Sequence, residues 1–210
     1  KFKFSHLYTL DSDPKIKHAG TYEGKSGKSG NVTDEQAYQN VIDEVKTNAQ
    51  ADKPAQFIEL VTMQNHAPYP GIYGDENEFF AADASNVPDG EKGVIGNYAK
   101  GVQRTDAATK QFLDELDAID EPITVVFYGD HLPGIYTTAA NDPKNSLALH
   151  ETDYFIWSNK ASAAHDVKLP ESNAAYSSSN YFMAQTAQQL NARVSPYLAI
   201  QLQGIIRAQD

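Results

Sequence analysis

The chain has 210 residues, of which 40% are hydrophobic and 21% charged, and its formal net charge is -11 at pH 7. This length and balance are typical of a globular domain with a hydrophobic core and exclude a wholly disordered chain. The negative charge argues against non-specific binding to nucleic acid or to an anionic membrane surface. The absence of cysteine excludes thiol catalysis, disulfides and thiolate metal sites.

The first thirty residues predict little regular structure. Residues 1–10 read as a short strand or an extended lead-in, and residues 11–30 as a polar loop rich in glycine and lysine. The segment EGKSGKSG does not match the spacing of a phosphate-binding loop, and no apolar strand precedes it. Because the apolar pattern is already under way at Phe2, we expect the chain to begin inside a larger protein.

A helix is predicted from Thr33, because Thr33 and Gln36 have the spacing of a capping box and two acidic residues favour the positive end of the helix dipole. The apolar residues at 38, 41, 42 and 45 share one face, which we expect to be core. The run FIELVT at 57–62 predicts a strand that is buried on both faces.

The next elements predict an α/β fold. An amphipathic helix over about 92–119 precedes a second apolar strand at 123–128, so residues 57–128 read as a βαβ unit with parallel strands. A third strand is predicted at 153–158, and closing helices at 181–192 and 196–207. We therefore expect one α/β domain over residues 1–210, with a mostly parallel sheet flanked by helices.

Candidate metal ligands follow the strand at 123–128. Gly129 ends the strand and Asp130 and His131 come next, at the strand edge where α/β sheets bind ligands. A carboxylate with an imidazole suits Mn²⁺ or Zn²⁺ better than Mg²⁺ or Ca²⁺. The structural alternative is that Asp130 caps the turn and His131 is a satisfied core histidine. Two ligands are also too few for a catalytic metal site, so further ligands are expected elsewhere.

A second candidate site follows the strand at 57–62, in the segment MQNHAPYPGIYG. Asn65 and His66 there are candidate substrate-binding residues. His66 could ligate a metal, donate to an anionic substrate oxygen, or be a loop histidine bonded to backbone. The long loop over 71–89 is a candidate wall or lid.

Four segments in this order and spacing resemble one family. They are NHAPY at 65–69, the helix with NYAKGVQRTDAATKQFLDEL, the strand and loop TVVFYGDHLPG, and ETDYFIWSN. Together they resemble the C-terminal half of the sulfatase-like lipoteichoic acid synthases and phosphoglycerol transferases of Gram-positive bacteria, in the alkaline phosphatase superfamily. The resemblance extends from about Phe2 through the closing helices.

The resemblance implies specific roles. It assigns Asp130 and His131 to a catalytic Mn²⁺, with Zn²⁺ or Mg²⁺ as possible substitutes, and His66 to a phosphoglycerol head group. The family's nucleophilic threonine and remaining metal ligand are not found in these residues and are expected upstream. The implied reaction is attack by a threonine alkoxide on a phosphodiester, giving a covalent intermediate that passes to a glycerol hydroxyl or water. This chain alone is therefore expected to be inactive or nearly so.

Two functional hypotheses remain open from the sequence. The first is an extracytoplasmic transferase or sulfatase-like hydrolase, membrane-attached only through upstream segments, that acts on a phosphoglycerol lipid or another phosphate or sulfate ester. The second is a non-catalytic cell-surface binding module that keeps the fold. Because an incomplete sheet exposes its edge and apolar face, self-association of the chain is also expected.

Overall fold

The computed structural model describes residues 4–25, 27–51, 53–69, 71–74, 77–81, 87–171 and 176–207. The residues divide into two compact units. The first unit holds Lys1–Glu115 and His131–Glu151, and the second holds Leu116–Asp130 and Thr152–Asp210. The prediction of a single domain over the whole chain stays a prediction.

The first unit contains a hairpin and two long helices. Strands β1 (Thr21–Gly24) and β2 (Gly27–Val32) pair antiparallel, so the predicted loop over 11–30 is wrong in its second half. The sequence did not predict this hairpin because its strands are glycine-rich and lack the apolar alternation that marks most strands. Helix α1 (Asp34–Gln50) follows, then the 3₁₀ turn η2 (Glu78–Ala81), helix α2 (Asp89–Asp117), the short α3 (Thr137–Ala140), and the 3₁₀ turns η3 (Pro143–Asn145) and η4 (Ala148–His150).

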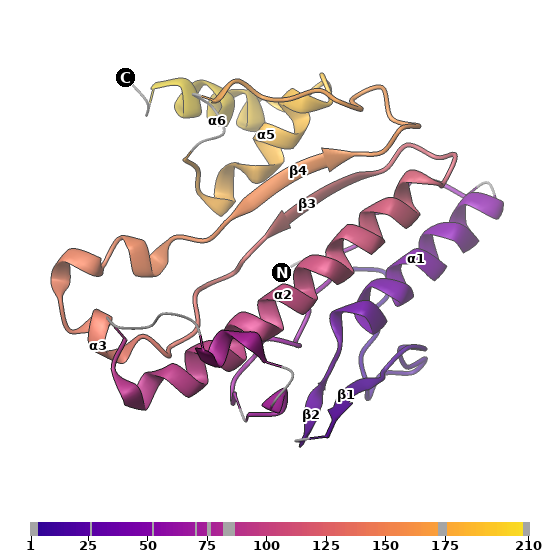
Figure 1. The fold of residues 1–210 in the computed structure, drawn as a ribbon. Helices are drawn as coiled ribbons and strands as arrows, with labels where there is room; N and C mark the ends of the chain where they lie inside the picture. The colour runs from indigo at the N-terminus through magenta and orange to yellow at the C-terminus, as the bar shows by residue number, and fades with distance from the viewer. Residues whose placement is uncertain are drawn as a thin grey trace. The chain divides into compact units, whose positions relative to one another are not determined.

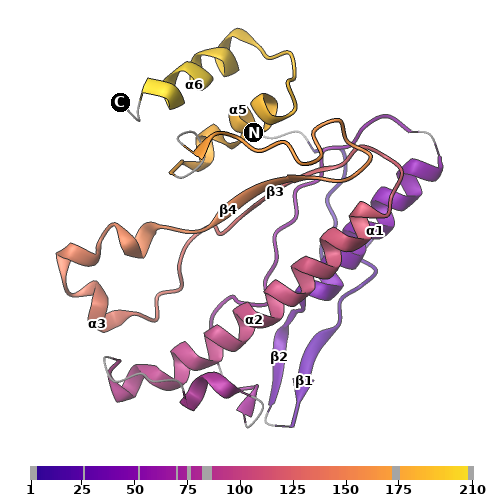
Figure 2. The same cartoon turned by 45° about the horizontal axis from the view of Figure 1, so that its top comes forward.

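Helices α1 and α2 lie side by side in Figures 1 and 2. As predicted, Thr33 is the N-cap of α1, and its side chain accepts a hydrogen bond from the backbone N–H of Gln36 at 3.4 Å. The rings of Tyr38 and Phe112 stack between the two helices with centroids 4.5 Å apart. The hydroxyls of Tyr38 and Thr109 are 2.8 Å apart. This contact packs α1 against α2 and buries both rings.

The second unit is organised around one antiparallel pair. Strands β3 (Thr124–Tyr128) and β4 (Tyr154–Ser158) pair over all five positions, from Thr124 with Ser158 to Tyr128 with Tyr154. The rings of Phe127 and Phe155 stack at 4.9 Å. The 3₁₀ turn η5 (Ser179–Tyr181) leads into helices α5 (Phe182–Gln189) and α6 (Pro196–Arg207), which match the predicted closing helices.

Asn159 connects the end of α2 to β3 in this unit. It is fully buried, and its Nδ2 donates to the carbonyls of Leu116, Ile119 and Glu121 at 2.8 to 3.2 Å. Its Oδ1 accepts from the backbone N–H of Ile123 at 2.9 Å. One side chain therefore satisfies a carbonyl in the last turn of α2, two carbonyls of the connection that follows it, and the last donor before the strand.

The α/β class predicted from the sequence is confirmed, but the predicted parallel βαβ unit is wrong. Residues 57–62 form no strand, and the side chains of Phe57 and Val61 are 70% and 72% exposed. Both sheets within the described ranges are two-stranded and antiparallel. An apolar run becomes a strand only where another strand satisfies its backbone groups, and within the described ranges residues 57–62 have none.

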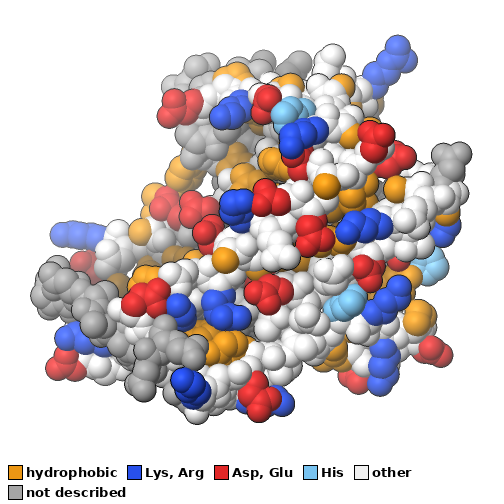
Figure 3. Space-filling model, turned by 45° about the vertical axis from the view of Figure 1, so that its right-hand side comes forward, with side chains coloured by type: hydrophobic (Ala, Val, Ile, Leu, Met, Phe, Trp, Pro, Cys, Tyr) orange, Lys and Arg blue, Asp and Glu red, His pale blue; other side chains and the backbone are white. Residues whose placement is uncertain are grey.

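Acidic and basic side chains are interspersed on the face that Figure 3 shows. On this face the acidic side chains are therefore not gathered into one field. None of the described helices combines the length and the apolar character that crossing a membrane requires.

Candidate functional site

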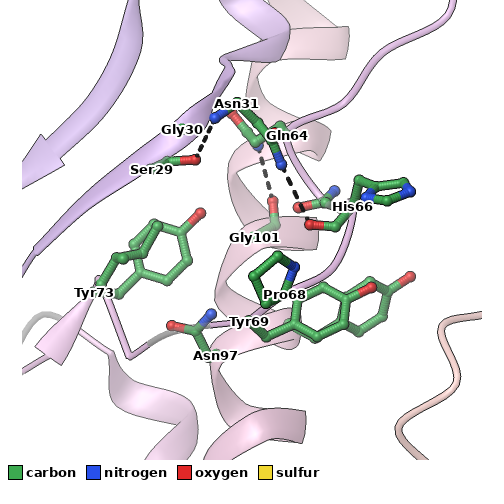
Figure 4. Close-up of a pocket in the computed structure, with 13 residues that line it drawn as sticks. Ser29, Gly30, Asn31, Gln64, His66, Pro68, Tyr69, Tyr73, Asn97 and Gly101 are labelled. Atoms are coloured by element: carbon green, nitrogen blue, oxygen red, sulfur yellow. Dashed lines mark hydrogen bonds between the residues drawn. The ribbon is translucent and has the colours of Figure 1, made fainter.

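A pocket of about 200 Å³ lies in the first unit, against the middle of α2. The end of β2, the loop that carries Asn65 and His66, and one face of α2 form its walls (Figure 4). The pocket thus contains the substrate-binding residues predicted from the sequence. Its described lining consists of Ser29, Gly30, Asn31, Gln64, Asn65, His66, Pro68, Tyr69, Ile72, Tyr73, Asn97, Tyr98 and Gly101.

A hydrogen-bond network fixes the loop to both helices. Thr105 of α2 accepts from Asn65 Nδ2 at 2.7 Å and from Gln64 Nε2 at 3.2 Å. Its hydroxyl donates to Asp34 Oδ2 at 2.5 Å. The backbone N–H of Asp34 donates in turn to Gln64 Oε1 at 3.2 Å. Because these four residues hydrogen-bond to one another, the network holds Gln64 and Asn65 in one arrangement.

Asp34, the first residue of α1, is a buried carboxylic acid, with only 1% of its surface exposed. Burial raises its pKa above the usual 3.8, although the hydrogen bonds from Thr105, the Gln64 backbone and Thr62 act against that rise. The position at a helix N-terminus also favours the charged form. Burial outweighs these contributions because transfer of a carboxylate out of water is costly.

His66 lies at the rim of the pocket. Its backbone N–H donates to the carbonyl of Met63 at 3.1 Å, and its carbonyl accepts from Asn31 Nδ2 at 3.3 Å. The Nδ1 atom lies 2.7 Å from the carbonyl of Ala67. An Nδ1–H donor there leaves Nε2 as the atom that can meet a ligand. In Figure 4 the imidazole points away from Tyr73 on the other side of the pocket.

Gly101 allows the loop to approach α2. A Cβ atom at this position would lie 2.3 Å from Asn65 Oδ1, which is closer than real contacts allow. The backbone carbonyl of the same glycine accepts from Gln64 Nε2 at 3.3 Å. A glycine inside a helix lowers its stability, and here the absence of a side chain makes room for Asn65.

The predicted metal ligands lie outside this pocket. Asp130 and His131 follow β3, and both side chains are exposed. Gly129 before them has a close neighbour, since a Cβ there would lie 3.0 Å from Thr152 Cβ, and the Thr152 hydroxyl donates to the Gly129 carbonyl at 2.7 Å. Gly129 therefore ends the strand where Thr152 packs against its backbone.

His131 has the same local geometry as His66. Its Nδ1 lies 2.9 Å from the carbonyl of the next residue, Leu132. Metal-ligating histidines commonly make such a contact, which fixes the ring and directs the other nitrogen to the metal. The donor types of Asp130 and His131 fit Mn²⁺ or Zn²⁺. Within the described ranges no group of three or more acidic or histidine side chains could hold a metal ion.

The sequence did not point to several residues of the site. Asn97, Tyr98 and Thr105 entered only as part of a predicted amphipathic helix and of its resemblance to the family, and Asp34 only as part of a helix start. The partners of Thr105 lie too far away in the chain for local patterns to reveal.

The sulfatase family model matches residues 2–192 of the chain. Among solved structures, the Streptococcus pyogenes phosphoglycerol transferase GacH, in complex with sn-glycerol-1-phosphate, is similar with a TM-score of 0.65 and 30% identity. The similarity covers 91% of this chain and 44% of that protein.

Two curated proteins of Rhizobium meliloti (strain 1021) also match. A putative cyclic beta-1,2-glucan modification protein is 30% identical over 117 residues, which are 50% of this chain and 18% of the relative. The capsular polysaccharide biosynthesis protein RkpI is 35% identical over 99 residues, 43% of this chain and 18% of the relative. The matches thus span less than half of each relative's length.

Proposed function

Because the chain belongs to the sulfatase family, within the alkaline phosphatase superfamily, we propose that it is part of a metal-dependent phosphoglycerol transferase or phosphodiesterase-like hydrolase of the cell envelope. Membership in the family confirms the resemblance drawn from the motifs. The activity, the metal and the extracytoplasmic location belong to the proposal.

The observation that carries the proposal is the placement of His66 at the rim of a pocket, with Nδ1 turned to the Ala67 carbonyl. An imidazole held in this way can direct Nε2–H to a phosphate oxygen. The similarity to a phosphoglycerol transferase in complex with sn-glycerol-1-phosphate supports a phosphate ester as the substrate class. The names of the two Rhizobium meliloti relatives support a saccharide acceptor.

In the proposed reaction, the oxygen of a threonine outside this chain attacks phosphorus and displaces the alcohol of the donor ester. A hydroxyl of the acceptor, or water, then attacks the same phosphorus and releases the threonine. Asp130 and His131 would provide part of the coordination of a divalent ion, which when bound would supply positive charge that lowers the pKa of the attacking hydroxyl and stabilises the transition state. His66 binds and orients the phosphate of the donor.

The test uses the polypeptide in which this chain follows the residues encoded upstream of Lys1. Hydrolysis of a phosphatidylglycerol analogue is measured with and without Mn²⁺, and Mn²⁺ binding is followed separately by electron paramagnetic resonance. We expect His131→Ala to lose both Mn²⁺ binding and turnover, and His66→Ala to keep Mn²⁺ but raise KM.

The matched control is His165→Ala, which removes a histidine paired with Asp166 in the second unit. It should retain metal binding and turnover. Full activity of His131→Ala would overturn the proposal. Absence of both Mn²⁺ binding and turnover in the unmodified polypeptide would favour a non-catalytic binding module.

A further inference from the structure

Apart from His66, the described lining of the pocket holds no acidic or basic side chain. Its described residues include four amide side chains and three tyrosines, and neither lysine, arginine, aspartate nor glutamate. The chain as a whole carries 45 such charged residues among 210, as 17 basic and 28 acidic. A buried charged group needs a counter-charge, so the described lining suits a neutral occupant and disfavours the phosphate itself.

Among the described polar side chains that line the pocket, Asn97 has a buried oxygen whose hydrogen-bonding capacity is not satisfied. It is 4% exposed, it lines the pocket, and its Oδ1 has no hydrogen-bond partner among the described residues. Figure 4 shows it on α2, between Tyr73 and Tyr69. A buried amide oxygen without a donor is costly. Rotation of the amide by 180° exchanges oxygen and nitrogen, so the group can either accept from or donate to a bound hydroxyl.

Aromatic rings form one wall of the same pocket. Tyr69 and Tyr98 meet edge to face with centroids 5.6 Å apart, and Tyr73 is 4% exposed. Burial raises the pKa of Tyr69 and of Tyr73, so their phenols stay protonated and neutral. Rings of this kind offer an apolar surface, and their hydroxyls can donate or accept.

The size of the pocket limits its occupant. About 200 Å³ is below the 300–1,000 Å³ of typical ligand pockets, so it suits one small ring rather than a lipid chain or an oligomer. The occupant must be neutral, carry several hydroxyls and have a face that packs on tyrosine. A sugar ring meets all of these conditions.

We propose that this pocket is the acceptor subsite and binds a neutral sugar ring, with Asn97 hydrogen-bonded to one of its hydroxyls. The inference rests on the proposed function, because it places the acceptor next to the phosphate that His66 is proposed to bind. The phosphate stays at the rim, and the sugar enters the uncharged interior.

The test is saturation-transfer NMR of the protein with three probes: a neutral glucan disaccharide, glycerol and inorganic phosphate. We expect saturable binding of the disaccharide with a dissociation constant on the order of millimolar. Asn97→Leu, which keeps the volume and removes a buried polar group, should weaken binding about 3- to 10-fold. Tyr69→Leu, at a partly exposed position, should remove the packing face and weaken it similarly.

The control is Gln111→Leu, which replaces an exposed amide of the same helix that bonds to Glu115 and should leave binding unchanged. Thermal melting checks that each variant is folded. Equal disaccharide binding by Asn97→Leu, preference for glycerol, or phosphate that competes with the disaccharide would each overturn the proposal. These readouts need no turnover, so failure of the acceptor subsite is distinct from loss of the proposed enzymatic activity, which His131→Ala tests.

Discussion

The hydroxyl of Thr105 donates a 2.5 Å hydrogen bond to the buried carboxyl of Asp34. The same oxygen accepts from the two amides that precede His66. One threonine therefore joins the start of α1, the middle of α2 and the loop that carries the candidate phosphate-binding histidine. Its removal should affect substrate binding without direct contact with substrate.

Thr105→Val should remove the hydrogen bonds that Thr105 makes with Asp34 and Asn65 and one of the two that Gln64 Nε2 donates. We expect it to lower the free energy of unfolding by about 1–3 kcal/mol. It should also raise KM for the phosphodiester several-fold, because Asn65 and His66 lose their fixed position. The control is Thr109→Val, one turn along the same helix, which loses only the contact with the Tyr38 hydroxyl. Denaturant unfolding and steady-state kinetics give both quantities. An equal KM in the two variants would contradict a positioning role for Thr105.

Asp34→Asn should change how stability depends on pH. The folded-state pKa of Asp34 is raised, so the stability contributed by its protonated form is complete below pH 3.8 and lost as pH rises through the raised pKa. The asparagine variant should lack this loss. Denaturant unfolding between about pH 3.5 and about pH 7 measures it. Asp106→Asn, which removes an exposed carboxyl beside Thr105, should keep the unmodified profile. A parallel profile for Asp34→Asn would show that Asp34 has no raised pKa.

Gly101→Ala should disturb the site, because its Cβ would lie 2.3 Å from Asn65 Oδ1. We expect a loss of about 1–3 kcal/mol in the free energy of unfolding. Gly90→Ala, in the same helix, has open space around its Cβ position and should be neutral or stabilising by up to about 1 kcal/mol. Unfolding curves of the two variants make the comparison. Similar curves would mean that Asn65 moves aside at little cost.

Asn159→Ala should be among the most destabilising single changes in the second unit. It removes four hydrogen bonds and leaves three carbonyls and one N–H without that partner. We expect a loss of roughly 3–5 kcal/mol in the free energy of unfolding. Asn145→Ala, which removes a single bond to the Ala139 carbonyl, should cost about 1 kcal/mol. Comparable losses in both variants would refute a connecting role for Asn159.

Glu91→Ala should loosen the segment that follows His131. The Glu91 carboxylate accepts from the hydroxyls of Thr137 and Thr138 and from the Thr138 backbone N–H, which holds α3 to the start of α2. Hydrogen exchange of the Thr138 amide should become faster by at least several-fold. Asp89→Ala, which loses an exposed pair with Lys92, should leave that amide unchanged. Unchanged exchange in Glu91→Ala would show that other contacts hold the segment.

Local signals in the sequence predicted most helices and two of the strands. The capping box at Thr33, the amphipathic repeat of α2 and the apolar runs of β3 and β4 each depend on neighbours within a few residues. The pairing direction of β3 and β4 depends on the path of the chain between them, which residues 129–153 do not reveal by pattern. The apolar run at 57–62 was read as a strand because periodicity cannot show whether a partner strand exists.

Part of the candidate site was also predicted. Asn65 and His66 were predicted as candidate substrate-binding residues, and both line a pocket. Their support from Thr105 and Asp34 was not predicted, because these contacts join positions 40 and 71 residues apart. Metal binding by Asp130 and His131 stays a prediction.

The exposed run from Phe57 to Met63 should affect the fate of newly synthesised protein in the cell, independently of catalysis. Phe57, Ile58, Leu60, Val61 and Met63 are each at least 38% exposed, in an extended stretch with no strand assigned to it. Apolar, extended segments of this kind are what holdase chaperones bind and what nucleates aggregation. We therefore expect the yield of soluble protein to depend on how soon after synthesis this run is covered, and substitutions there to alter abundance more than turnover.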